Sequence, residues 1–253
     1  MIYDLIAPFY DAVNRDIDYG SWADFIEECF QRYMSQKPTL VLDLASGTGS
    51  MTLELAKRGY DMTGVDISTE MLEISREKAE KAGQNNILWL CQDMRAFELY
   101  GTVDAAVCCL DSINHLTRTA ELLECLALVH NYLIPDGLFI FDINARAKFE
   151  TVYADNAYVM NISDDVCIWQ NFYNEKTRLC DFLITLFKAE DDGRYERYEE
   201  CDRERMYTLR SVKSALSKSG FEFVGAYSDF DFTEASDGCD RIYFVAKCKK
   251  QEG

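Results

Sequence analysis

This chain of 253 residues lacks several features that would assign its class directly. It has no apolar run of the roughly 18 residues that a membrane-spanning helix needs, and acidic residues stand near its start, so we expect neither a membrane protein nor a secretory signal. No two of its cysteines have C-x-x-C spacing, and it has only 2 histidines, which disfavours a metal site. Scattered cysteines are typical of reduced thiols in a cytoplasmic protein.

Positive charge is also scarce. Lys and Arg together number 26 against 44 Asp and Glu, so the formal net charge is −18. An acidic surface repels phosphate backbones, which disfavours nucleic acid as a partner. Hydrophobic residues, in contrast, make up 48% of the chain, enough for a substantial core. The length fits one large domain or a domain with a sizeable insertion.

The most informative stretch runs from Leu40 to Gly49, where an apolar run ends in two glycines one residue apart. Such a run is typical of a parallel strand buried on both faces, and an amphipathic helix is predicted to follow from Met51. Gly47 and Gly49 let the backbone turn sharply and approach a ligand closely. The next predicted strand ends at Asp66, where nucleotide-binding βαβ units use an acid to hold ribose hydroxyls.

The spacing around these glycines separates two classes of cofactor. A dinucleotide fingerprint needs a third glycine, in G-x-G-x-x-G, and Thr52 occupies that place. The observed pattern, D-x-A-x-G-x-G followed by G-V-D, resembles motif I and the acidic loop of class I S-adenosylmethionine-dependent methyltransferases. That family usually has glycine where this chain has Ala45, whose methyl group restricts φ, so the detailed conformation of the loop is left open.

The resemblance implies that S-adenosyl-L-methionine is the cofactor, with the loop under its methionine half and Asp66 on its ribose. It also places Asp93, after a third predicted strand, at the adenine amino group with help from the backbone of Met94; taken alone, Asp93 can equally be a loop-capping acid. The cofactor-binding residues predicted in this way are Asp43, Ala45, Ser46, Gly47, Thr48, Gly49, Asp66, Ile67, Met71, Gln92, Asp93, Met94 and Leu110.

Polar residues follow the fourth predicted strand, 103–110, which is apolar throughout and therefore central. Ligands of open α/β sheets bind beyond the carboxyl ends of the strands, and this segment resembles motif IV, which faces the transferable methyl group. His115 is the candidate that orients or deprotonates the acceptor, because a neutral imidazole accepts a proton near pH 7. Asp111 is a weaker competing base, and Tyr10 is expected to shape the pocket. A lone histidine can equally be an ordinary loop or core residue.

Two further segments have an expected place near the site. Residues 3–13 predict a short helix whose Y-D-x-I-A-x-x-Y-D text resembles the opening of small-molecule methyltransferases, which folds over cofactor and substrate; it can equally be a docking helix. Residues 151–207 show strand alternation and a hairpin signal at Asp192-Gly193. We predict an inserted antiparallel β subdomain there, which serves as a lid over a small-molecule acceptor, as a homodimer surface, or as both.

Together these patterns predict an α/β fold with a Rossmann-like, seven-stranded, mostly parallel sheet and helices on both faces. The core comprises residues 1–150 and 208–253, with a turn at 135–137 before the fifth strand. The predicted function is transfer of a methyl group to nitrogen or oxygen of a small molecule by in-line displacement, with catalysis mostly by positioning. The alternatives are a non-catalytic S-adenosylmethionine-binding module and, against the loop spacing, a nicotinamide-dependent oxidoreductase.

Overall fold

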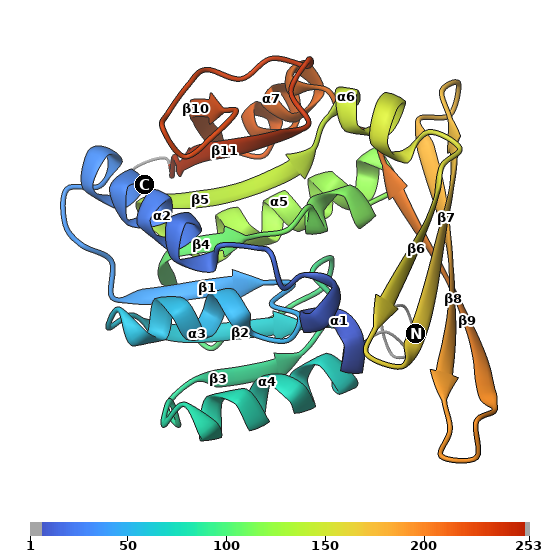
Figure 1. Ribbon diagram of the computed structural model, residues 1–253. Helices are drawn as coiled ribbons and strands as arrows, with labels where there is room; N and C mark the ends of the chain where they lie inside the picture. Colours follow the sequence, from blue (N-terminus) through green and yellow to red (C-terminus); the bar gives the residue numbers. More distant parts are fainter. Residues whose placement is uncertain (1–6, 251–253) are drawn as a thin grey trace.

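A computed structural model describes residues 7–250, which form a seven-stranded sheet flanked by helices and a separate four-stranded sheet (Figure 1). The strand order of the large sheet is β10-β11-β5-β4-β1-β2-β3. All its pairs are parallel except those that β11 makes with β5 and β10. The predicted Rossmann-like sheet is therefore confirmed. The observed strands of this sheet are β1 (Leu40–Leu44), β2 (Asp61–Asp66), β3 (Leu88–Cys91), β4 (Val103–Cys108), β5 (Leu133–Asn144), β10 (Phe221–Tyr227) and β11 (Arg241–Cys248).

Helices cover both faces of this sheet, as expected for parallel strands that are apolar on both sides. Phe25 and Ile26 lie on the buried stripe of α2 and pack with Met62 of β2 in one core. On the opposite face of the sheet, Leu126 of α5 packs with Phe139 of β5 in a second core. The first layer contains α2 (Tyr19–Tyr33), α3 (Ser50–Lys57) and α4 (Thr69–Lys81), and the second contains α5 (Thr119–Tyr132) and α7 (Leu209–Lys218).

The second sheet is antiparallel and stands at the carboxyl ends of the core strands (Figure 1). Two short helical turns, α6 (Arg146–Lys148) and η2 (Phe149–Tyr153), lead into it from β5. At the end of the second sheet the chain returns to the core. Asn114 holds this return, because its Nδ2 donates to the carbonyl of Arg205 at 2.9 Å. The predicted antiparallel insertion is thus present as four strands: β6 (Ala157–Ile162), β7 (Asp165–Asn174), β8 (Leu179–Ala189) and β9 (Tyr195–Arg205).

The structure bears on two local predictions, the turn at 135–137 and the helix at 3–13. The predicted turn at 135–137 is wrong as a separate element, because β5 runs through it. The register against β4 shifts between Leu133 and Leu138, with Asp136 at φ 62°, so the chain bulges without leaving the sheet. The predicted helix at 3–13 is described only as α1 (Ala7–Val13), and residues 3–6 lie outside the described part of the chain. No helix within residues 7–250 is long and apolar enough to cross a membrane.

Candidate active site

A cavity of about 200 Å³ lies beyond the carboxyl ends of β1, β2, β3 and β4, and a smaller one of about 30 Å³ adjoins it. The two share Tyr10, Ala45, Gly47, Leu110 and Ser112 as lining residues. Of the other predicted cofactor residues, the larger cavity is lined by Asp66, Ile67, Met71, Gln92, Asp93 and Met94, and the smaller by Asp43, Ser46 and Thr48. Gly49 lines neither cavity and instead stands at the start of α3.

The glycine loop adopts a left-handed backbone at three alternate positions: Ala45 at φ 59°, Gly47 at φ 54° and Gly49 at φ 75°. Ala45 therefore does not prevent the turn, although an alanine in this region costs roughly 1–2 kcal/mol. Gly49 cannot be replaced as easily, because a Cβ there would lie 2.6 Å from the Trp89 ring and 3.0 Å from Ser75 Oγ.

Asp66 is fixed at the end of β2 by two backbone donors. Its carboxylate accepts hydrogen bonds from the Gly47 N–H at 2.7 Å and the Ser68 N–H at 2.9 Å. Burial raises its pKa, and these backbone bonds oppose the rise. A carboxylate has about four acceptor positions, so two bonds leave room for ribose hydroxyls. Ser68 also caps α4, whose Met71 N–H donates to Ser68 Oγ at 3.2 Å; this places Ile67 and Met71 at the cavity.

The methionine end of the predicted cofactor site contains buried polar groups. Asp43 accepts a hydrogen bond from the Thr52 hydroxyl, and burial raises the pKa of Asp43 to about 7. The buried hydroxyl of Ser46 has no hydrogen-bond partner among residues 7–250. Buried polar atoms normally have partners, so a polar ligand group fits this smaller cavity.

At the opposite end Asp93 is paired with Arg95, a cavity-lining residue that the sequence analysis missed. Arg95 Nε donates to both Asp93 oxygens, at 2.9 and 3.0 Å, and this bonding lowers the pKa of Asp93. Arg95 also donates to Glu121 at 2.9 Å. The local signal was present, since an arginine two residues after an acid in a loop can fold back onto it.

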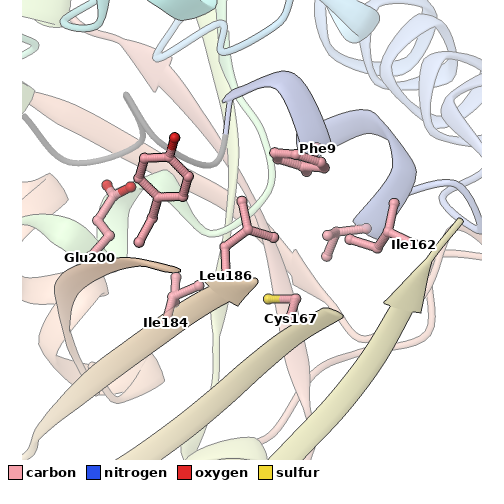
Figure 2. A pocket seen from close by; sticks show the side chains of 8 residues that line it. Phe9, Ile162, Cys167, Ile184, Leu186 and Glu200 are labelled. Carbon is pink, nitrogen blue, oxygen red and sulfur yellow. The ribbon is translucent and has the colours of Figure 1, made fainter. Parts of the chain in front are cut away.

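Helix α1 lies between the cavities and the second sheet. Tyr10 lines both cavities, and burial raises the pKa of its hydroxyl. The next residue, Asp11, accepts hydrogen bonds from Thr48 Oγ1 and Lys78 Nζ, both at 2.6 Å. Phe9 lies against the second sheet, where it meets an apolar group seen in Figure 2, formed by Ile162, Cys167, Ile184 and Leu186.

Asp111 is a poor base here. Its carboxylate lies 2.7 Å from a guanidinium nitrogen of Arg241, which also pairs with Asp142, and the Asp111 N–H donates to Asp142 at 2.9 Å. Burial alone would raise its pKa, but Arg241 holds the pKa of Asp111 below its usual range. Asp111 is not among the residues that line the two cavities. The predicted role of Asp111 as a competing base does not fit this pairing.

His115 lines the larger cavity from the short turn η1 (Ser112–His115). Its Nδ1 lies 3.2 Å from a carboxylate oxygen of Asp202, on β9 of the second sheet. Burial lowers the pKa of His115, but Asp202 outweighs burial and raises it to about 10. An imidazole with this pKa holds its proton at neutral pH and donates hydrogen bonds. The predicted orienting role fits this state, whereas the predicted role as a neutral proton acceptor does not.

A second buried carboxyl, Glu204, belongs to the same cluster. His115, Asp202 and Glu204 each place one nitrogen or oxygen within 4.8 Å of the others. His115 and Asp202 are already paired at 3.2 Å, and Glu204 stands beside this pair in a network of buried ionisable groups. Burial raises the pKa of Glu204 to about 8.

Comparisons with known proteins agree with this geometry. Residues 41–137 match a family model described as a methyltransferase domain. The chain is 31% identical over 247 residues to a putative methyltransferase of Geobacillus sp. (strain WCH70), covering 98% of this chain and 100% of that one. It is 32% identical over 225 residues to the dTDP-3-amino-3,6-dideoxy-alpha-D-glucopyranose N,N-dimethyltransferase of Streptomyces fradiae, covering 85% and 83%. The crystal structure of an S-adenosylmethionine-dependent methyltransferase from Clostridium acetobutylicum ATCC 824 superposes with a TM-score of 0.86 at 28% identity, covering 98% and 99%.

Proposed function

Because this chain belongs to the class I S-adenosylmethionine-dependent methyltransferases, we propose that it moves a methyl group to nitrogen or oxygen of a small-molecule acceptor. The observation that carries the proposal is the cavity at the carboxyl ends of β1–β4, which the predicted cofactor residues line on one side and His115 on the other. His115 is in turn paired with Asp202 of the second sheet. The acceptor would therefore bind where the two sheets meet.

The residues of this chain would act mainly by holding and orienting. When bound, the cofactor supplies a methyl group on a positively charged sulfur, which makes the methyl carbon electrophilic. Asp66 would hold the ribose hydroxyls, and the open backbone at Gly47, where the nearest atom to an added Cβ is 4.0 Å away, would admit the methionine half. Protonated His115 would orient the acceptor by donating a hydrogen bond. Positioning of this kind can supply most of the acceleration.

The second sheet would act as the lid of the acceptor site, with residues 151–207 as an inserted subdomain of the core. Contacts at the end of β9 support this role, because Asp202 reaches His115 and the Arg205 guanidinium donates to the Thr117 carbonyl at 3.1 Å. The same subdomain can also carry a homodimer surface on its other face. The ten free cysteines support a reaction in the cytoplasm, where thiols stay reduced.

The test is a turnover assay with a metabolite extract and isotopically labelled S-adenosylmethionine. We expect release of S-adenosylhomocysteine that depends on the extract, together with an extract component that gains one methylene in mass. The Streptomyces fradiae relative supports a small, amine-bearing component as the first to examine. Cofactor binding without transfer to any component would favour the non-catalytic binding module and contradict the proposal.

A further inference from the structure

Glu204 is a buried carboxyl without a role in the proposed chemistry. It lies near the end of β9, with 4% of its surface exposed, two residues after Asp202 and therefore on the same face of the strand. Its carboxylate is within 4.8 Å of a nitrogen of His115, which lines the cofactor cavity. Glu204 is not among the residues that line the two cavities, but it stands beside His115, where the acceptor would approach the methyl group.

The cations around Glu204 each have another partner, although protonated His115 lies within 4.8 Å of its carboxylate. Asp202 has His115 as its partner, and Asp111 has Arg241. Lys148, from α6, is the other nearby cation, but its Nζ donates to Asn144 Oδ1 at 2.9 Å. Glu204 itself has one long hydrogen bond, 3.5 Å from Asn144 Nδ2, and forms no ion pair within residues 7–250. Two uncharged ionisable groups also face it, the Tyr153 hydroxyl of η2 and the Cys180 thiol of β8.

Such a carboxyl is suited to receive a positive charge together with a proton. Burial, with Asp111 next, raises the pKa of Glu204 to about 8, whereas His115 and Lys148 lower it. A base works best when its pKa is near the pH of the reaction, and an ordinary carboxylate is far from neutral pH. An ammonium ion would give Glu204 an ion-pair partner of its own and carry the proton to be removed. An alcohol, whose hydroxyl is about as weakly acidic as water, would need a much stronger base.

We propose that Glu204 accepts the proton of an acceptor bound as an ammonium ion, so that the substrates of this chain are amines; the inference rests on the proposed function. The ammonium nitrogen loses one proton to a Glu204 oxygen and keeps the electron pair of that N–H bond. This pair attacks the methyl carbon, and the carbon–sulfur bond breaks with its electrons going to sulfur. The products are a methylated ammonium ion and S-adenosylhomocysteine, and protonated Glu204 returns its proton to solvent.

The first experiment measures the carboxyl without any acceptor. Infrared difference titration should show a carboxylic-acid carbonyl band that disappears with a midpoint of about 8 in the unaltered protein. Buried Asp43, with a pKa of about 7, contributes a band of its own, so the test is the component with a midpoint of about 8. That component should be absent in Glu204→Gln and present in Glu199→Gln, an exposed glutamate of the same strand and the matched control. A spectrum of Glu204→Gln that keeps this component unchanged would overturn the proposal.

The second experiment follows transfer from labelled S-adenosylmethionine into a metabolite extract. We expect the label on nitrogen, and in Glu204→Gln a loss of kcat/KM of about 10²–10⁴-fold at neutral pH with unchanged cofactor affinity. The loss should shrink at higher pH, where the free amine is already present, and Glu204→Asp should recover part of the activity. Glu199→Gln should behave like the unaltered protein.

The outcomes of this assay separate the two proposals. A label on oxygen or carbon, or full activity in Glu204→Gln, would overturn the role of Glu204 and leave small-molecule methyl transfer standing. A folded protein that binds the cofactor but labels no component would overturn the proposed function and this inference with it. Melting curves of both glutamine variants establish that each is folded.

Discussion

The two halves of the site are built in different ways. In the cofactor half, Asp66 accepts from the backbone of Gly47, 19 residues earlier, and the loop and its acid belong to one βαβ unit. In the proposed acceptor half, side chains meet across much longer separations: Asp111 with Arg241 over 130 residues, and Asn114 with Arg205 over 91. The comparison teaches that local backbone geometry sets the first half, whereas charge pairs between distant segments set the chemistry of the second.

Removing the second sheet should separate the halves completely. Replacing residues 157–205 by a short Gly-Ser linker takes away Asp202 and Glu204 but none of the residues predicted to bind the cofactor. We therefore expect methyl transfer to be abolished. The cofactor affinity measured by calorimetry should stay within about threefold, which corresponds to roughly 0.7 kcal/mol of binding free energy. A cooperative melting transition is the control for folding. Retained transfer would contradict the lid.

Gly49→Ala should break the cofactor half by steric strain. The new Cβ would have a left-handed φ and lie 2.6 Å from Trp89, and we expect a loss of about 2–4 kcal/mol in the free energy of unfolding. Gly47→Ala is the matched variant, since its Cβ meets no atom closer than 4.0 Å. It should lose only about 1–2 kcal/mol of stability but weaken cofactor binding more. Urea unfolding measures the stability of both variants, and calorimetry measures their cofactor affinity. Equal losses of stability in Gly49→Ala and Gly47→Ala would contradict the steric explanation.

Asp66→Ala tests the ribose contact. Hydrogen bonds to a charged group are worth about 1.5–3 kcal/mol each, so the Kd for S-adenosylmethionine should rise at least roughly tenfold. Asp61→Ala, at the exposed start of the same strand, is the control and should bind normally. Calorimetry that gives the same Kd for Asp66→Ala and the unaltered protein would remove Asp66 from the cofactor site.

The smallest expected effect is on the pH dependence of stability, through the ion pair between His115 and Asp202 that joins the core to the second sheet. The pKa of His115 is raised from 6.5 to about 10, so the stability from its pair with Asp202 is fully present below about pH 6.5 and is lost as pH rises through about 10. The melting temperature of the unaltered protein should therefore fall over this range more than that of His115→Asn.

Two further variants sharpen this test. Asp202→Asn removes the other member of the pair and should flatten the pH dependence in the same way. His130→Asn replaces the other histidine, which contacts the Lys249 carbonyl at 3.0 Å and lines neither cavity, and is the control variant. Identical profiles of melting temperature against pH for His115→Asn and the unaltered protein would show that the ion pair with Asp202 does not hold the proton on His115.

Some residues of the site had no signal that sequence analysis could have used. Arg95 could have been suspected from its place two residues after Asp93. Arg241 could not, because it reaches Asp111 only through the insertion of β11 beside β5. The partner of His115 was equally hidden, since the position of Asp202 depends on how the second sheet meets the core.

The sequence by itself determined the elements of the core and the cofactor loop, because apolar periodicity, paired glycines and the acid at Asp66 act over a few residues. Even Ala45, the departure from the family pattern, only adopts the conformation that the loop requires. Tertiary structure alone decided the protonation in the acceptor half. Buried in one cluster, His115 gains a carboxylate partner and keeps its proton, whereas burial raises the pKa of Glu204, which forms no ion pair within residues 7–250, to about 8. A side chain's pKa depends on burial and neighbouring charge, and both come from segments that are distant in the chain.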